Sequence, residues 1–329
     1  MSTAPAIDEY PIKQIPDTPL WSENFALAAA HGAKRASVFY SIGRWYADPT
    51  IWRENVLMAL PDGRILSARH YGRNASQNGP GASFSKFEVV RPGQELKLTY
   101  AGPVWESTAE HMLERGVPEA PAGLCSLDLT FLATGPVWNM RGDSVEASAM
   151  AGGLHIEQIG AANASIVYRG ETLTFEECYT IRDHSRGVRD PTSFKKHSWL
   201  NGDFPGRRSF FVYAMQFQGS DSIGMTNAVI LEAGKFHPAT VAHVEFISGA
   251  GDMRRPHSLI LDSGLGRMDV RFAEVLTSIP MSFVNPFDPL PGRVAEGPSV
   301  IMFDEAARLE WNGMQGIGWS ERGVASKPL

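Results

Sequence analysis

Charged and titratable side chains crowd into residues 180–190, which read Thr-Ile-Arg-Asp-His-Ser-Arg-Gly-Val-Arg-Asp. Because a charged group is costly to bury unless it is paired, such density indicates either an ion-pair cluster or a functional site. His184 is suited to general acid or base catalysis, since its ordinary pKa lies near neutrality. In the catalytic interpretation an aspartate orients this ring, and arginines hold a substrate oxygen or stabilise developing negative charge. The aspartates are Asp183 and Asp190, and the arginines are Arg182 and Arg189.

A second pair of titratable residues, His155 and Glu157, lies upstream in an alternating run. Side chains of a strand alternate between its faces, so this histidine and carboxylate share one face and form a candidate proton-transfer pair. Both could also bind a metal, together with His184 and His197. The His-x-Glu spacing is common by chance and lacks the helical spacing of zinc hydrolases, so we assign no metal site. A Ser-His-Asp nucleophile is also disfavoured, because no Gly-x-Ser-x-Gly elbow occurs.

Strand alternation sets a geometric condition on the 180–190 cluster. In a regular strand Asp183 and His184 point to opposite faces and cannot enter the same cavity. Gly187 can adopt backbone angles that other residues avoid, so we predict that the strand bends or bulges after Ser185. If it does not, the cluster is a clamp in which arginines and aspartates pair with each other.

Further substrate contacts are predicted around the same site. Ser185 belongs to the cluster, and Tyr179 precedes it on the same strand. Trp45 follows Arg44, and an arginine stacked on an indole ring can form a ligand platform. The alternative for this pair is ordinary packing at a rim.

The composition excludes several classes of protein. Of the 329 residues, 20% are charged and 43% hydrophobic, as in an ordinary folded domain. A net charge of -6 and a pI near 5.9 offer no attraction to nucleic acid or to an anionic membrane surface. The two cysteines, Cys125 and Cys178, are too far apart for a zinc knot, and the N-terminal residues do not resemble a signal peptide. We therefore expect a cytoplasmic protein that binds a hydrophobic small molecule, and a homodimer is left open.

Short alternating runs separated by Gly, Pro, Asn and Asp are typical of antiparallel β-structure. Only residues 22–33 and 107–115 have a helical pattern. The glycines of residues 313–318 do not follow a strand and open a helix, so no nucleotide cofactor is predicted, and none of another kind. We predict an all-β fold of two antiparallel β-barrel or sandwich domains with few short helices, since closure removes exposed strand edges. The domains are predicted at residues 1–198, carrying the charged motif, and 199–329.

Several motifs together resemble a known group. They are His155-Ile156-Glu157-Gln158, the stretch 182–190, and Trp311-Asn312-Gly313 followed by residues 316–321. The order resembles an uncharacterised bacterial family with an Arg-Asp-His-Ser-Trp-Gly motif. That family is distantly similar to two-domain lipocalin-like proteins, which include carotenoid 1,2-hydratases (hydroxyneurosporene synthases) and fungal Diels-Alderases. This chain departs from the pattern at Arg186, where tryptophan is usual, and at Pro191.

The resemblance implies two lipocalin-like barrels facing each other, with an apolar ligand at their interface and chemistry without nucleotide or metal. It favours a cofactor-independent lyase, hydratase or isomerase that acts on a hydrophobic small molecule such as a terpenoid, steroid or lignin-type aromatic. Its catalytic residues would be His184, Asp183, His155, Glu157 and Arg189. The alternative is a non-catalytic lipocalin-like carrier, whose cavity should hold few ionisable groups.

Overall fold

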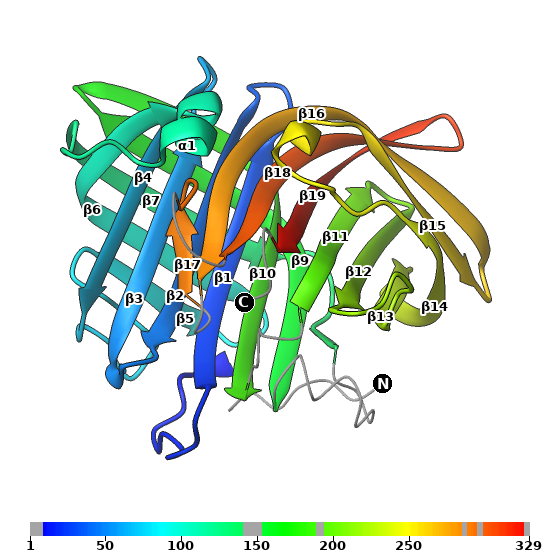
Figure 1. The fold of residues 1–329 in the computed structure, drawn as a ribbon, viewed down its shortest axis with the longest axis horizontal. Coiled ribbons are helices and arrows are strands. Elements are labelled where there is room, and N and C mark those ends of the chain that lie inside the picture. Colours follow the sequence, from blue (N-terminus) through cyan, green and yellow to red (C-terminus); the bar gives the residue numbers. More distant parts are fainter. Residues whose placement is uncertain (1–8, 141–152, 189–193, 285–287, 295–298, 326–329) are drawn as a thin grey trace.

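The computed structural model describes residues 9–140, 153–188, 194–284, 288–294 and 299–325. Its strands form two antiparallel sheets that lie side by side (Figure 1). The first sheet closes into a barrel because its last strand pairs with both its neighbour β9 and the first strand β1. In hydrogen-bonding order, the strands of this N-terminal barrel are β10 (Glu171–Val188), β1 (Trp21–His31), β2 (Ala36–Trp45), β3 (Asp48–Ala59), β4 (Arg64–Gly72), β6 (Glu95–Thr108), β7 (Gly123–Ala133) and β9 (Leu154–Tyr168). Strand β5 (Ser85–Arg91) pairs with β6, and β8 (Trp138–Asn139) pairs with β9.

The second sheet closes in the same way, through a pairing of β15 with β16. In hydrogen-bonding order, the strands of this C-terminal barrel are β15 (His257–Ser263), β14 (Lys235–Val244), β13 (Met225–Glu232), β12 (Arg208–Phe217), β11 (Phe194–Phe204), β19 (Met314–Ala325), β18 (Ser299–Trp311) and β16 (Gly266–Val284). A short strand, β17 (Asp288–Pro291), pairs with β16 and lies against β3 and β4 of the first barrel. The prediction of an all-β fold with two antiparallel barrel units is confirmed.

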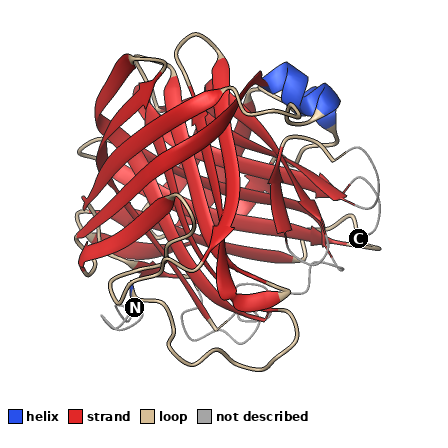
Figure 2. Cartoon of the chain, turned by 90° about the vertical axis from the view of Figure 1, so that its left-hand side faces the viewer, coloured by secondary structure: helices blue, strands red, loops and turns tan. Residues whose placement is uncertain are grey.

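Helices contribute little to this fold (Figure 2). Helix α1 (Ala109–Arg115) confirms the helix predicted near residues 107–115, and the Thr108 side chain caps it by accepting a hydrogen bond from the His111 N–H at 3.3 Å. A short 3₁₀ turn, η3 (Ala250–Asp252), lies between β14 and β15. Across the part of the chain that is described, no helix has the length and apolar character needed to cross a membrane.

The helix predicted for residues 22–33 is wrong, because these residues form β1. Phe25 and Leu27 point into the N-terminal barrel, whereas Ala28 and Ala30 pack between the barrels. A strand buried on both faces carries a continuous apolar run and loses the alternation by which a strand is recognised. The apolar residues of this segment therefore resemble a helical pattern, although they form a strand.

Strand alternation divides most of the buried apolar side chains among three large cores, and two small clusters hold others. One fills the N-terminal barrel and another fills the C-terminal barrel. The third lies between the barrels and takes side chains from the facing surfaces of both, including Phe39 of β2 and Trp319 of β19. These two rings stack with centroids 6.1 Å apart, and nearby the Ser37 and Thr277 hydroxyl oxygens lie 2.7 Å apart. The barrels thus share a buried interface, which holds the candidate site.

Strand β10 runs straight through the charged cluster. Its residues from Tyr179 to Val188 pair one by one with β1, without a register shift at Gly187. The irregularity lies earlier, between Phe175 and Cys178 in the pairing with β9, where Glu177 has a φ of 52°. The pairing therefore shows no bulge after Ser185, although Gly187 has a φ of 145°, a backbone angle that favours glycine, as predicted. A regular strand sends Asp183 and His184 to opposite faces, and this decides which of them can reach the interface.

Candidate functional site

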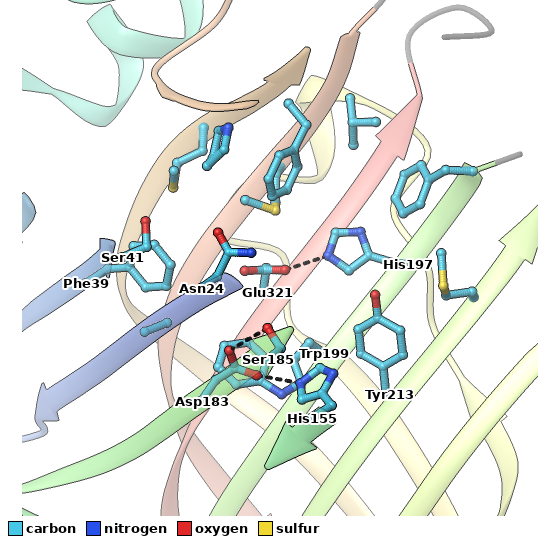
Figure 3. Close-up of a pocket in the computed structure, with 18 of the residues that line it drawn as sticks. Asn24, Phe39, Ser41, His155, Asp183, Ser185, His197, Trp199, Tyr213 and Glu321 are labelled. Carbon is cyan, nitrogen blue, oxygen red and sulfur yellow. Dashed lines mark hydrogen bonds and ion pairs between the residues drawn. The ribbon is translucent and has the colours of Figure 1, made fainter. Parts of the chain in front are cut away.

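A cavity of about 150 Å³ lies between the barrels. An apolar cavity of this volume can hold one aromatic ring. Most of its wall is apolar and comes from both barrels, as with Phe39, Phe194, Trp199, Met215, Met281 and Met302. Five side chains that are either charged groups or imidazoles also line it, namely Arg53, His155, Asp183, His197 and Glu321. In Figure 3, His155 and Asp183 lie on strands of the N-terminal barrel, and His197 and Glu321 lie on strands of the C-terminal barrel.

The polar wall of the N-terminal barrel is built from neighbouring positions on successive strands. His155 of β9 pairs with Ser185 of β10, Ser185 pairs with Asn24 of β1, and Asn24 pairs with Gly43 of β2. Gly43 in turn pairs with Arg53 of β3, which completes one cross-strand row. The residues two positions away from this row on each strand form a second, parallel row on the same outward face. The second row includes Glu157 and Asp183.

His155 forms the centre of the first acid–base group. Its Nε2 lies 2.5 Å from Asp183 Oδ2 and 3.4 Å from Glu157 Oε1, and Glu157 Oε1 accepts a hydrogen bond from Trp199 Nε1 at 2.9 Å. Burial lowers the pKa of His155, but Asp183 and Glu157 outweigh it and raise this pKa to about 9. Burial raises the pKa of Glu157. The His155 ring is therefore an imidazolium at neutral pH.

His197 forms the second group, on the C-terminal barrel. Its Nε2 lies 2.7 Å from Glu321 Oε1. Burial lowers the pKa of His197 to about 3, so we treat this contact as a hydrogen bond of a neutral ring and not as an ion pair. Glu321 is directly opposite Asp304 on the neighbouring strand, and burial followed by repulsion from Glu321 raises the pKa of Asp304. Asp304 Oδ1 also accepts a hydrogen bond from Trp319 Nε1 at 3.1 Å.

Tyr213 of β12 stands between the two histidines (Figure 3). Its ring centroid lies 6.2 Å from that of His155 and 6.3 Å from that of His197. In each imidazole Nε2 contacts a carboxyl group, while Nδ1 is buried and has no hydrogen-bond partner among the described residues. Two titratable groups whose surroundings move their pKa values apart can serve as an acid and a base at the same pH. The cavity thus brings together one charged and one neutral imidazole.

The structure places the predicted residues in two separate environments. His155 and Glu157 share a face, as predicted, and the straight β10 adds Asp183 and Ser185 to them. His184 points instead into the N-terminal barrel, where it stacks on Phe25 at a centroid distance of 3.8 Å. Its Nε2 lies 3.3 Å from Glu23 Oε1. Asp183 and His184 therefore do not meet in one cavity, which corrects that geometric expectation.

The other predicted contacts do not line the cavity. Arg182 donates from Nη2 to Glu9 at 2.8 Å and to Gln158 at 2.8 Å. It is thus paired within the protein, as the clamp interpretation expects. The Tyr179 hydroxyl donates to Asn201 at 2.7 Å and ties the barrels together. Trp45 packs edge-on against Tyr46 and Tyr71 at the end of β2. Two predicted residues, Arg189 and Asp190, lie outside the described residues.

His155, Glu157 and Asp183 each offer one possible metal-ligand atom, and these three atoms lie within 4.8 Å of one another. This set is one nitrogen and two oxygens. The same atoms of His155 and Asp183 already form the 2.5 Å contact. The metal interpretation weighed from the sequence also named His184 and His197, which do not belong to this set of ligand atoms.

Several residues of the cavity were missed as catalytic or binding candidates, and His197 was considered only as a metal ligand. Glu321 ends the C-terminal motif, but nothing in the sequence indicates that it faces His197 of another strand. Arg53, Glu54 and Asn55 are consecutive polar residues that precede an apolar run on β3, and this polar cluster is a signal that could have been used. Tyr213 is surrounded by apolar residues and gives no such signal.

Two closed barrels with a ligand-sized cavity at their interface define the class of protein: an all-β, two-domain fold of the lipocalin-like kind. A family model described as "Domain of unknown function (DUF7064)" matches residues 5–323, so the chain belongs to that family. Among curated proteins, none matches this sequence.

Solved structures share the fold at low sequence identity. CghA, also solved with Sch210972, is 12% identical with a TM-score of 0.55 over 93% of this chain and 88% of its own chain. Kievitone hydratase from Nectria haematococca is 12% identical with a TM-score of 0.53 over 99% and 94%. An AttH-like protein from Nitrosomonas europaea is 10% identical with a TM-score of 0.56 over 95% and 98%. At such identities the likeness shows the fold alone, and this fold is the two-domain all-β fold expected from the resemblance to lipocalin-like proteins.

Proposed function

We propose that this protein is an acid–base enzyme that adds water to, eliminates water from, or isomerises a hydrophobic small molecule held between the barrels. The observation that carries this proposal is the convergence of five ionisable side chains on an otherwise apolar cavity. A carrier of apolar ligands has no use for a charged and a neutral imidazole facing the same space, because each buried ionisable group costs stability. An enzyme needs both.

The two imidazoles take complementary roles in this proposal. For hydration, the His155 imidazolium donates its Nδ1 proton to one carbon of a double bond, and water attacks the other carbon. His197 then accepts the surplus proton of that water, so the substrate gains the elements of water and both rings return to their starting state by proton exchange. Dehydration is the reverse. Isomerisation uses one ring to remove a proton from carbon and the other to return one.

The carboxyl groups act through the histidines. Asp183 holds His155 by Nε2, which leaves Nδ1 for the substrate and stabilises the imidazolium. Glu321 holds His197 in the same way. Of the substrate classes predicted from the sequence, a cavity that holds one aromatic ring favours a lignin-type aromatic or a small terpenoid over a steroid, and the similarity to a hydratase fits an addition or elimination of water. All the groups that these steps require are side chains of this protein.

Deuterium incorporation tests this proposal without knowledge of the product. The protein would be incubated in D₂O with a panel of unsaturated terpenoids, steroids and hydroxylated aromatics, and mass spectrometry would detect deuterium bound to carbon. We expect exchange with at least one class and its loss in His155→Gln and His197→Gln. The matched control is His257→Gln, because His257 is also buried, with its pKa lowered by burial to about 3, but it binds Ser320 outside the cavity.

Two results would oppose the proposal. Binding of a panel compound without any exchange at carbon would favour the carrier. Exchange that survives both cavity variants would place the chemistry elsewhere.

A further inference from the structure

We infer that the cavity recognises a carboxylate on its substrate, and that Arg53 binds it. This inference rests on the proposed function, because it names the substrate class of the same site: an apolar acid and not a neutral hydrocarbon or alcohol. It is carried by a buried arginine at the cavity wall that the acid–base steps do not use.

Arg53 is 2% exposed and lies at the opposite end of the polar row from His155. Its Nη1 donates to Asp288 Oδ1 at 3.0 Å, but its Nε has no partner among the described residues. A guanidinium presents five donors in a fixed fork that matches the two oxygens of a carboxylate. A buried donor without a partner is costly, so a ligand that supplies an acceptor to Arg53 Nε would be bound more tightly.

The charges around Arg53 do not cancel. Asp288 also binds Arg69, whose Nη2 donates to Oδ1 at 2.8 Å and to Oδ2 at 2.7 Å. One carboxylate is thus shared between two guanidinium groups. The charged groups that act on Arg53 are Asp288 and Arg69, together with the Tyr71 hydroxyl. The cluster retains one positive charge at the cavity, which an anionic ligand would neutralise.

Gly43 keeps the approach to Arg53 open. A Cβ atom at this position would lie 3.0 Å from Arg53 Nη2 and closer still to the Asn24 amide oxygen. The absence of a side chain on β2 therefore lets Arg53 reach across from β3 toward Asn24 on β1. Both residues line the cavity; Asn24 turns its amide oxygen toward Gly43, and its Nδ2 donates to Ser22 Oγ at 3.2 Å.

The spacing of strands sets the length of the substrate. The guanidinium lies over β2, and β10, which carries Asp183, is two strands away. Neighbouring strands are about 4.8 Å apart, so the carboxylate and the reacting carbon should be separated by ~10 Å. One aromatic ring with a short chain has this length. We therefore expect an arylalkanoic acid or a terpenoid acid of similar size.

Paired probes test the inference directly. Isothermal titration would compare 4-phenylbutanoate with 4-phenylbutan-1-ol, which has the same ring and chain but no charge. We expect the acid to bind about tenfold more tightly, as for a charge-assisted hydrogen bond at a buried site. Arg53→Met should abolish this preference. Arg91→Met removes the same charge from an exposed arginine that pairs with Glu95 away from the cavity, and it should keep the preference.

A second variant guards against misfolding of Arg53→Met. Asp288→Asn keeps the shape of the side chain but frees both arginines, so it should increase the preference for the acid. Equal binding of acid and alcohol to the unaltered protein would overturn the carboxylate site while leaving the apolar cavity intact. Equal losses in the two arginine variants would also overturn it. If neither probe binds, the cavity does not accept apolar ligands, and the proposed function fails together with this inference.

Discussion

Two histidines of one cavity differ in charge because their surroundings differ. His155 has two carboxyl groups within 3.4 Å and a pKa of about 9, whereas burial dominates at His197 and lowers its pKa to about 3. Between these values the protein holds an imidazolium and a neutral imidazole at the same time. The proposed acid and base are therefore both in their working form at neutral pH.

The pH dependence of activity should report His155. Its acid form is lost as the pH rises through its pKa, so we expect activity to fall near pH 9. Asp183→Asn removes one of the charges that stabilise the imidazolium, and it should move this alkaline limb about 1–2 pH units lower. The matched control is Asp128→Asn on the exposed face of β7, which should leave the limb unchanged. An alkaline limb that stays in place in Asp183→Asn would contradict the assignment of His155 as the acid.

His184 should matter for folding and not for turnover. Its ring is 1% exposed, stacks on Phe25 and contacts Glu23. We expect His184→Ala to lower the free energy of unfolding by about 3 kcal/mol, comparable to the loss of a buried aromatic ring, with unchanged activity per folded molecule. Denaturant unfolding and exchange in D₂O measure the two effects. Loss of activity at unchanged stability would restore the catalytic role predicted from the sequence.

At the scale of the element, the site depends on strand alternation. The rule correctly placed His155 and Glu157 together and correctly separated Asp183 from His184 within a regular strand. It could not decide which face of β10 meets the second barrel, because both faces are buried. The error at residues 22–33 has the same cause: a strand packed on both sides loses its alternating pattern.

A glycine on β19 makes room for His197. Gly323 is opposite His197 in register, and a Cβ there would lie 2.6 Å from Nδ1 and 3.1 Å from Val300 Cγ1. We expect Gly323→Ala to displace the imidazole, to reduce exchange in D₂O more than tenfold and to destabilise the fold by about 1–3 kcal/mol. Gly264→Ala is the control, because a Cβ there meets no atom within 4 Å. Full activity in Gly323→Ala would show that the position of the His197 ring is not critical.

At the scale of the whole molecule, the two closed barrels could be predicted from the sequence, but their interface could not. Turn residues and short alternating runs indicate most of the strands, and the cost of exposed strand edges favours their closure. Which barrel surfaces meet depends on side chains far apart in the chain, such as Phe39 against Trp319. His197 and Glu321 reach the cavity only through this meeting of barrels, so the sequence indicated one half of the site and missed the other.

The most direct test of the account is the charge of the two histidines. Nitrogen-15 NMR of imidazole-labelled protein, assigned with His155→Gln and His197→Gln, would follow both rings from pH 5 to pH 10. We predict that His155 is charged at neutral pH and loses its proton near pH 9, while His197 stays neutral throughout. Titration of both rings together near their ordinary pKa, about 6.5, would contradict the central claim that this cavity holds an acid and a base.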